Sequence, residues 1–193
     1  MGALAATQRR TFAFVPQASA VLVEARSSVG PISFGSTDVS GHISATMLGT
    51  DIDLDQPLEA SLSLPVDSLV SGNQLYDAEI RSRLNSQRFP TIVANLRSVT
   101  AIASDRFSVT GDLTIHGTTS QETGTVNVAV TALAAAEPAS SSPGSGGITV
   151  VITGSRRVDI RDFDIELPSV LMLQIYPDVT VRFRLTASSD DHS

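Results

Sequence analysis

Residues 106–121, RFSVTGDLTIHGTTSQ, alternate between two chemically different sets of side chains. One set contains Phe107, Val109, Gly111, Leu113, Ile115 and Gly117, and the other contains Ser108, Thr110, Asp112, Thr114 and His116. Successive side chains of a β-strand point to opposite faces, so this period of two predicts a strand with one apolar and one polar face. The apolar face has to be shielded from water, and it lies against either a filled core or a cavity that holds an apolar ligand.

Similar runs recur along the chain and predict further strands at residues 11–15, 19–25, 41–47, 58–66, 91–99, 124–133, 147–154, 156–163 and 178–187. Many short alternating strands with little helix between them are typical of an antiparallel all-β fold, either a sandwich or a barrel. Because short turns join consecutive strands, we favour an up-and-down meander, which loses its exposed edges when it closes on itself. A length of 193 residues suits a single domain.

Residues 73–86, NQLYDAEIRSRLNS, have a helical period instead. Their apolar stripe contains Leu75 or Tyr76, Ile80 and Leu84. Ser71 or Asn73 can cap the start, and opposite charges form the i,i+4 pairs Asp77–Arg81 and Glu79–Arg83. We therefore predict one short amphipathic helix whose apolar stripe covers a barrel mouth or a sheet face.

Charge and composition exclude several classes of function. A net charge of −7 lacks the basic footprint that binding to duplex nucleic acid or to an anionic membrane surface requires. The chain has no cysteine, which excludes disulfides, thiolate metal sites and cysteine nucleophiles. Aromatic residues make up only 5% and Trp is absent, so Val, Ile, Leu and Ala have to supply the interior.

The N-terminal region resembles an export signal only in part. Residues 7–15, TQRRTFAFV, contain paired arginines and ASA at 18–20 could serve as a cleavage site, but the apolar run ends at Pro16. A secretory signal needs an apolar region of about 7 to 15 residues, and a membrane-spanning helix needs about 20. We therefore expect a soluble cytoplasmic protein without an integral membrane segment, with export as the alternative.

The sequence DIDLD at residues 51–55 begins like a calcium-binding loop. Gln56 stands where such a loop needs Gly for its sharp turn, and Leu62 stands where it needs a carboxylate. We therefore predict an edge strand with Ile52 and Leu54 facing inward and the aspartates facing outward.

No group of residues has the pattern of a catalytic or metal site. His42, His116 and His192 lack the spacing of metal ligands, and the polar parity of His116 predicts that it faces solvent at a turn. Acidic and basic residues alternate over residues 156–164, where we expect ion pairs to neighbouring strands rather than paired catalytic carboxylates. The chain also lacks the motifs of serine hydrolases, P-loops and dinucleotide sites. We therefore predict no enzymatic activity, no cofactor and no metal.

Residues 166–179, ELPSVLMLQIYPDV, form an apolar run interrupted by Pro168 and Pro177. Because proline limits strand pairing, we predict a loop beside the barrel mouth. This loop either covers the core, acts as a ligand gate, or stays exposed as a contact patch that would allow a homodimer.

Several segments together resemble the YceI-like family. Residues 109–119, VTGDLTIHGTT, are similar to its most characteristic strand motif, and residues 71–92, SGNQLYDAEIRSRLNSQRFPTI, resemble its helix followed by an aromatic-Pro strand entry. Residues 159–163, DIRDF, are similar to an Arg/Asp-Phe-Gly segment in which Asp164 replaces the usual Gly. Residues 16–30 resemble the opening strand of the family.

The resemblance implies an eight-stranded antiparallel lipocalin-like barrel without catalytic residues, and some family members hold a polyisoprenoid chain inside the barrel. We accordingly expect one domain over residues 1–193, with an ordered core at about 11–187 and a flexible loop at 134–147. An eight-stranded barrel has room for side chains or for one slim ligand. An apolar wall with few polar anchors suits a hydrocarbon chain, at about 0.8 kcal/mol per buried methylene.

The inward strand positions and the 166–179 run give the residues that we expect to contact this ligand: Phe14, Leu62, Leu64, Val109, Leu113, Ile115, Val128, Val150, Ile152, Leu171, Leu173, Val181 and Phe183. Our leading hypothesis is a non-enzymatic binding or carrier protein for a long isoprenoid or acyl chain. One alternative is a filled barrel that acts as a protein-interaction or stress-related structural module. Another is an enzyme or a haem carrier.

Overall fold

The computed structural model describes residues 7–132, 147–166, 169–170 and 173–189. For residues 169, 170, 173 and 174 it describes the backbone alone. The predicted flexible loop at 134–147 lies outside the described residues except for Gly147. No helix among the described segments has the length and apolar character needed to cross a bilayer.

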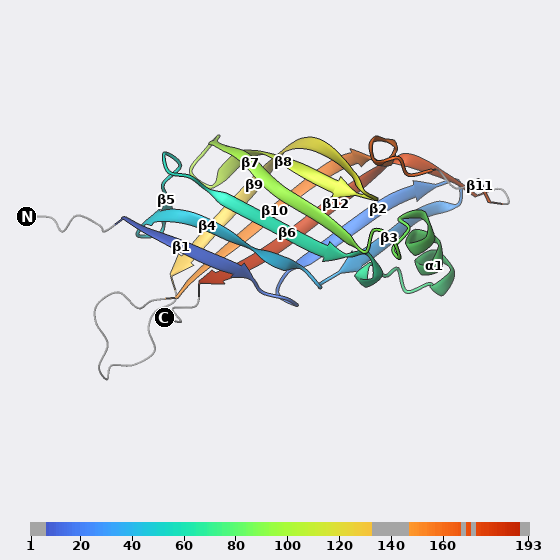
Figure 1. The fold of residues 1–193 in the computed structure, drawn as a ribbon, viewed down its shortest axis with the longest axis horizontal. Coiled ribbons are helices and arrows are strands. Elements are labelled where there is room, and N and C mark those ends of the chain that lie inside the picture. The colour runs from blue at the N-terminus through green and yellow to red at the C-terminus, as the bar shows by residue number, and fades with distance from the viewer. Residues whose placement is uncertain (1–6, 133–146, 167–168, 171–172, 190–193) are drawn as a thin grey trace, which may run out of the picture.

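Eight antiparallel barrel strands follow one another around the barrel in chain order (Figure 1). The first two barrel strands each consist of two segments, β1 (Thr7–Phe14) with β2 (Ala20–Ser27), and β3 (Gly30–Ser36) with β4 (Ser40–Leu48). The other six are β6 (Glu59–Pro65), β7 (Thr91–Ala101), β8 (Arg106–Ile115), β9 (Thr118–Ala132), β10 (Ile148–Asp159) and β12 (Leu173–Ser189). Because β12 pairs with both β1 and β2, the sheet closes on itself. The predicted all-β meander and barrel are therefore confirmed.

The remaining elements are short and lie at the two ends of the barrel. They are β5 (Asp51–Ile52), η1 (Val66–Ser68), α1 (Gln74–Arg83), η2 (Ile160–Phe163) and β11 (Ser169–Val170). We call the end at which α1 lies the helix end, and the end at which Thr7 and Ser189 lie the terminal end (Figure 1).

The bend in the first barrel strand is stabilised by a buried serine. The chain leaves the regular ladder after Phe14 and passes Gln17, whose φ is 67°. The backbone N–H of Thr186 then donates to Ser19 Oγ at 3.0 Å, so a hydroxyl replaces the missing backbone acceptor. Ser19 is fully buried, which is the condition under which an unpaired N–H would be costly.

The β8–β9 hairpin corrects the first predicted strand. That strand ends at Ile115, and residues 118–121 belong to β9. His116 and Gly117 form the two-residue turn with φ of 52° and 78°, as a type I′ turn requires at both positions. A Cβ on Gly117 would also lie 2.4 Å from the ring of Phe89, so the φ and the packing both favour glycine there.

Two other boundaries differ from the prediction. The runs 147–154 and 156–163 form one strand, β10, followed by the 3₁₀ helix η2. The segment β3 had no predicted counterpart, because Pro31 and Gly35 interrupt its alternation. Backbone pairing with β2 and a bridge between Gly35 and Val70 hold this strand in place despite its weak pattern.

Helix α1 confirms the predicted element and one of its two ion pairs. Asn73 caps the helix, because its Oδ1 accepts a hydrogen bond from the backbone N–H of Leu75 at 2.9 Å. Arg83 Nε donates to Glu79 Oε1 at 2.7 Å, as predicted. Leu75 is 80% exposed, so the buried side of the helix carries the later members of the stripe and not Leu75.

The second predicted ion pair, Asp77–Arg81, is wrong. Asp77 Oδ1 instead accepts hydrogen bonds from the backbone N–H and the Oγ of Ser71, both at 2.7 Å. These hydrogen bonds hold the pKa of Asp77 below its usual value. Arg81 turns to Asp67, with 3.6 Å between Arg81 Nε and Asp67 Oδ1. The buried carboxylate therefore ties the start of α1 to the preceding turn.

Candidate functional site

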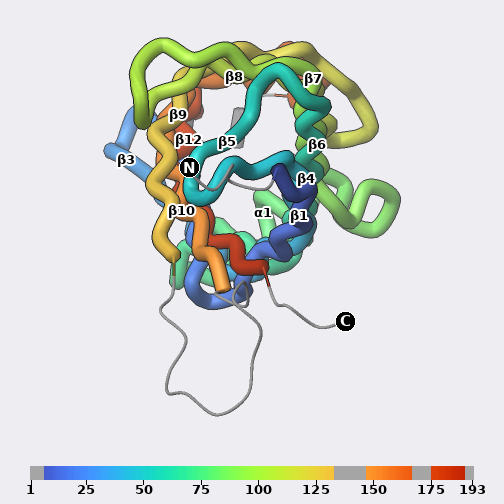
Figure 2. Tube along the Cα trace, turned by 90° about the vertical axis from the view of Figure 1, so that its left-hand side faces the viewer, coloured from blue at the N-terminus to red at the C-terminus, as the bar shows by residue number. Residues whose placement is uncertain are grey.

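A cavity of about 750 Å³ lies inside the barrel. Figure 2, viewed from the terminal end, shows the strands arranged as a ring. All eight barrel strands and α1 contribute side chains to its wall, and these are mostly Val, Ile, Leu, Ala and Phe. Ligand pockets of proteins commonly span about 300–1,000 Å³, so the cavity has the size of a binding site.

Almost all of the predicted ligand-contacting residues line this cavity, namely Phe14, Leu62, Leu64, Val109, Leu113, Ile115, Val128, Val150, Ile152, Val181 and Phe183. Leu171 lies outside the described residues, and Leu173 belongs to β12 with its side chain outside the description. The strand parity therefore placed the wall correctly, while contact of these residues with a ligand stays a prediction.

The interior is packed on one side and open on the other. Buried apolar side chains such as Phe12, Ile43 and Met47 are concentrated on β1 to β4. On β7, β8 and β9, Val126 is the only buried hydrophobic residue among those that the structure describes. Cavity-facing residues there, such as Leu113, are half-buried although they point inward. The apolar face of β8 therefore borders an open cavity and not a filled core.

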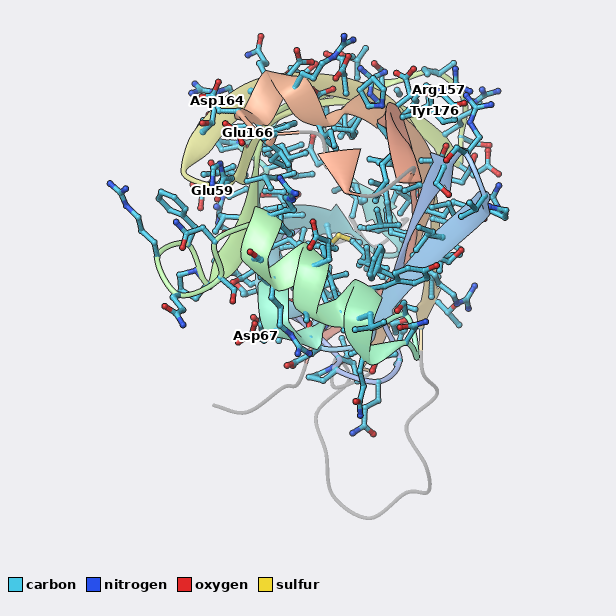
Figure 3. The ribbon with its side chains drawn as sticks, turned by 90° about the vertical axis from the view of Figure 1, so that its right-hand side faces the viewer. Glu59, Asp67, Arg157, Asp164, Glu166 and Tyr176 are labelled. Atoms are coloured by element: carbon cyan, nitrogen blue, oxygen red, sulfur yellow. The ribbon has the colours of Figure 1, made fainter. Side chains whose placement is uncertain are left out.

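The helix end is covered by α1, as predicted for the amphipathic helix. Tyr76, Ile80 and Leu84 line the cavity from this end, and Leu84 is 7% exposed. Figure 3 looks onto this end and shows α1 along one part of it, with the segment that carries Asp164 and Glu166 on the opposite part.

The DIDLD segment lies at the terminal end as an edge strand. Ile52 pairs with Met47 of β4, and both Ile52 and Leu54 line the cavity. Asp53 Oδ1 accepts a hydrogen bond from the backbone N–H of Asp55 at 3.0 Å, which closes a local turn. The predicted edge strand is therefore confirmed for Asp51–Ile52 only, and Leu54 faces the cavity from the turn that follows.

The apolar run at 166–179 is not the predicted loop throughout. Its part from Leu173 onward belongs to β12, and Val170 of β11 pairs antiparallel with Leu173. The irregularity expected near Pro177 appears as a register shift between Ile175 and Val179 in the pairing with β2. Ile175 lines the cavity. Residues 171–172, the centre of the predicted gate, lie outside the described residues.

The prediction that His116 faces solvent is wrong in part. The residue is at a turn, as expected, but it is half-buried. Its ring lies edge-on to Phe89, with 5.1 Å between the ring centroids. Its Nδ1 is buried and has no hydrogen-bond partner among the described residues. His116 therefore packs at the β8–β9 turn through its ring.

Sequence reasoning missed a charged pair inside the cavity wall. Glu122 lies directly opposite Gly111, and Arg156 lies directly opposite Val181, so both occupy inward positions. Arg156 donates from Nε and Nη2 to Glu122 Oε2, at 3.2 and 2.9 Å. The signal was present in the alternation, because counting back from Val126 by twos reaches Glu122. The strand had been predicted to begin only at residue 124.

Two further ion pairs lie on the outer side or at a turn. Arg97, at the irregularity between β7 and β8, donates from Nε to Asp112 Oδ1 at 2.7 Å and lowers the pKa of that carboxyl. Arg161 donates to Asp159 at the start of η2. The expected ion pair to a neighbouring strand is thus confirmed for Arg156, which pairs with Glu122, whereas Arg161 pairs with Asp159 of its own segment.

Asp159 gives the fold a specific sensitivity to acid. Hydrogen bonds from Arg161 lower the pKa of Asp159 from 3.8 to about 2. A depressed pKa means that the ionised carboxylate stabilises the folded state above about pH 4, and that this contribution is lost as the pH falls toward 2. We expect the Tm of Asp159→Asn to fall less than the Tm of the parent as the pH falls from about 4 to 2, as measured by thermal melts. The control is Asp162→Asn, which removes an exposed carboxylate of the same short helix. If Tm fell equally with pH in the parent and in both variants, this account of Asp159 would be wrong.

The fold and sequence relate this chain to known proteins. Its backbone is similar to that of Burkholderia cenocepacia BcnA, with a TM-score of 0.66 and 16% identity over 87% of this chain and 95% of the other. It is also similar to a polyisoprenoid binding domain from Saccharophagus degradans, with a TM-score of 0.64 and 14% identity over 93% and 98%. A Campylobacter jejuni YceI protein gives a TM-score of 0.61 and 13% identity over 80% and 82%. No curated protein sequence matches the chain.

Identities at this level establish a shared fold, and the sequence itself carries the family assignment. The family model of the YceI-like domain matches residues 12–187, which is nearly the whole barrel. The chain therefore belongs to the YceI-like family.

Proposed function

We propose that the protein is a non-enzymatic carrier that holds one long apolar chain, isoprenoid or acyl, inside the barrel. The observation that carries this proposal is the open apolar cavity of about 750 Å³. Burial of each methylene in such a cavity contributes about 0.8 kcal/mol, so a long chain is held without a strong polar anchor. The printed description of the Saccharophagus degradans structure, a polyisoprenoid binding domain, supports an isoprenoid as the ligand class.

The charged residues of the wall fit binding better than catalysis. Glu79 pairs with Arg83, and Glu122 pairs with Arg156, so these carboxylates are engaged by guanidinium groups. A general base needs a carboxylate that is available to accept a proton at the reacting centre. The alternative of a filled barrel acting only through its surface requires a packed interior, and the cavity counts against it.

The first experiment is native mass spectrometry of the purified protein, followed by extraction and identification of any bound lipid. We expect a bound long-chain lipid, or uptake of a fluorescent prenyl probe by the lipid-free protein. A lipid-free mass together with no uptake of the prenyl probe or of a fluorescent fatty acid would refute the proposal.

A cavity-filling variant tests the location of the ligand. Val128 lines the cavity opposite Ile152, whereas its neighbour Ala129 is exposed on the outer face. We expect Val128→Trp to lower the affinity for the prenyl probe by about tenfold or more, because the indole occupies ligand space at a packing cost of about 1–3 kcal/mol. Ala129→Trp should bind like the parent. Equal affinities of the two variants in a fluorescence titration would place the ligand outside the barrel.

A further inference from the structure

Glu122 and Arg156 form an ion pair across two neighbouring strands of a mostly apolar wall. Two of its inward neighbours are glycines. Gly111 lies opposite Glu122, and a Cβ on Gly124 would lie 3.9 Å from Arg156 Cδ. The next inward position of β10 is Gly154, over which the ring of Phe183 packs. Gly111 and Gly124 thus leave room beside the pair, whereas Phe183 fills the space over Gly154, and the cavity extends to both charged side chains.

The guanidinium of Arg156 retains hydrogen-bonding capacity. Its Nε and Nη2 both donate to the same oxygen, Oε2 of Glu122. The guanidinium has five N–H donors, and Nη1 has no hydrogen-bond partner among the residues that the structure describes. The Arg156 side chain is 47% exposed and that of Glu122 is 19% exposed. Arg156 is therefore the accessible member of the pair.

A ligand that is hydrocarbon throughout does not suit this part of the wall. A methylene chain packed against Arg156 would remove water from its N–H donors without replacing the hydrogen bonds, which is unfavourable. An oxygen atom at this point of the ligand would accept from the guanidinium and restore them. The wall therefore favours an amphipathic ligand with an oxygen-bearing end near Arg156.

The charge of the pair indicates which kind of oxygen fits. Glu122 already neutralises Arg156, so the pair as a whole carries no net charge. A carboxylate or phosphate on the ligand would approach Glu122 as well and be repelled by it, and the other guanidinium of the wall, that of Arg83, is already paired with Glu79. An uncharged hydroxyl or carbonyl oxygen accepts a hydrogen bond without this penalty.

We propose that the Glu122–Arg156 pair binds the uncharged, oxygen-bearing end of the ligand while the chain lies along the apolar wall. This inference rests on the proposed function, and it narrows the ligand from any long apolar chain to a long-chain alcohol or carbonyl compound.

The test compares three competitors that share one carbon skeleton: geranylgeraniol, geranylgeranoic acid and the saturated hydrocarbon phytane. Each displaces a bound fluorescent prenyl probe and is delivered from the same neutral detergent micelles. The main variant is the double substitution Glu122→Gln with Arg156→Met, which removes the pair without leaving one charge unpaired. Arg157→Met is the control, because Arg157 lies on the outer face next to Arg156 (Figure 3).

We expect the parent and Arg157→Met to bind geranylgeraniol about tenfold more tightly than phytane, as one hydrogen bond to a charged donor allows. The double variant should bind phytane like the parent and lose the preference for the alcohol. A parent without this preference, or a double variant that keeps it, would overturn the role of the pair. Tighter binding of the acid than of the alcohol by the parent would overturn the assignment of an uncharged end. The proposed function fails separately, if neither the parent nor any variant takes up the prenyl probe.

Discussion

Ile115→Asp is expected to abolish uptake of an apolar chain and to destabilise the protein by about 3 kcal/mol. Ile115 ends β8 on the inward side, lines the cavity and packs against the buried core. A carboxylate there either stays ionised in an apolar wall or takes up a proton, and both outcomes oppose folding at neutral pH. Even where the variant folds, the ligand chain would have to lie against a polar group. Thermal melts and titration with a fluorescent prenyl probe measure the two effects.

The adjacent residue provides the matched control. Thr114 occupies the opposite parity of β8, and its Oγ1 lies 2.8 Å from Oγ1 of Thr119 on β9. Thr114→Asp loses this outward contact only, so we expect a cost of about 1 kcal/mol and unchanged uptake. If the aspartates at 114 and 115 had the same effect on melting temperature and on uptake, the assignment of inward and outward faces would be wrong.

The alternation of side chains was sufficient to predict the barrel because each strand has one face toward the interior and one toward water. It predicted less well where a strand changes partner or direction. The chain bends after Phe14 through the hydroxyl of Ser19, and β8 turns into β9 at His116 without breaking the polar pattern. Both features depend on hydrogen bonds or φ values at single residues, which a hydrophobic pattern does not record.

The apolar part of the site could be predicted and its charged part could not. Inward apolar positions follow directly from strand parity, so Leu113 and Val128 were found. Glu122 precedes the predicted strand at 124–133, and Arg156 was expected only to pair with a neighbouring strand, so neither residue was predicted to line the cavity. The Asp77–Arg81 pair was predicted from the i,i+4 spacing alone. It is wrong because Ser71, six residues before Asp77, donates a hydrogen bond to the carboxylate.

The sequence also left open whether the barrel is filled. The same inward residues could either meet at the barrel axis or leave space, depending on how large they are on each side. Phe12, Met47 and Phe34 fill the β1–β4 side, whereas Gly111 and Gly124 occupy inward positions of β8 and β9. The uneven distribution of large and small residues around the ring thus places the cavity, and this distribution becomes visible only when the strand order and register are known.

Gly41→Ala is expected to destabilise the protein by more than about 4 kcal/mol, which places it among the most harmful small substitutions in the barrel. Gly41 of β4 lies opposite Leu62 of β6, where the two backbones approach closely. Its φ of 127° is accessible to glycine, and a Cβ there would stand 2.0 Å from the carbonyl oxygen of Ser61 and 2.9 Å from its carbon. Both contacts are with backbone, so no change of rotamer relieves them, and the ladder between β4 and β6 would have to separate beside the cavity residue Leu62.

Gly30 separates the two causes of this effect. It has nearly the same φ, 128°, but lies at the β2–β3 turn with no atom within 4 Å of an added Cβ. Gly30→Ala therefore bears the conformational strain alone, at about 1–3 kcal/mol, and its cavity wall stays intact. The free energies of unfolding of both variants are measured in urea. The difference between them gives the cost of the collision with Ser61. We expect Gly41→Ala to lose probe uptake along with stability and Gly30→Ala to keep it. Equal losses of stability would show that the close approach of β4 to β6 does not constrain residue 41.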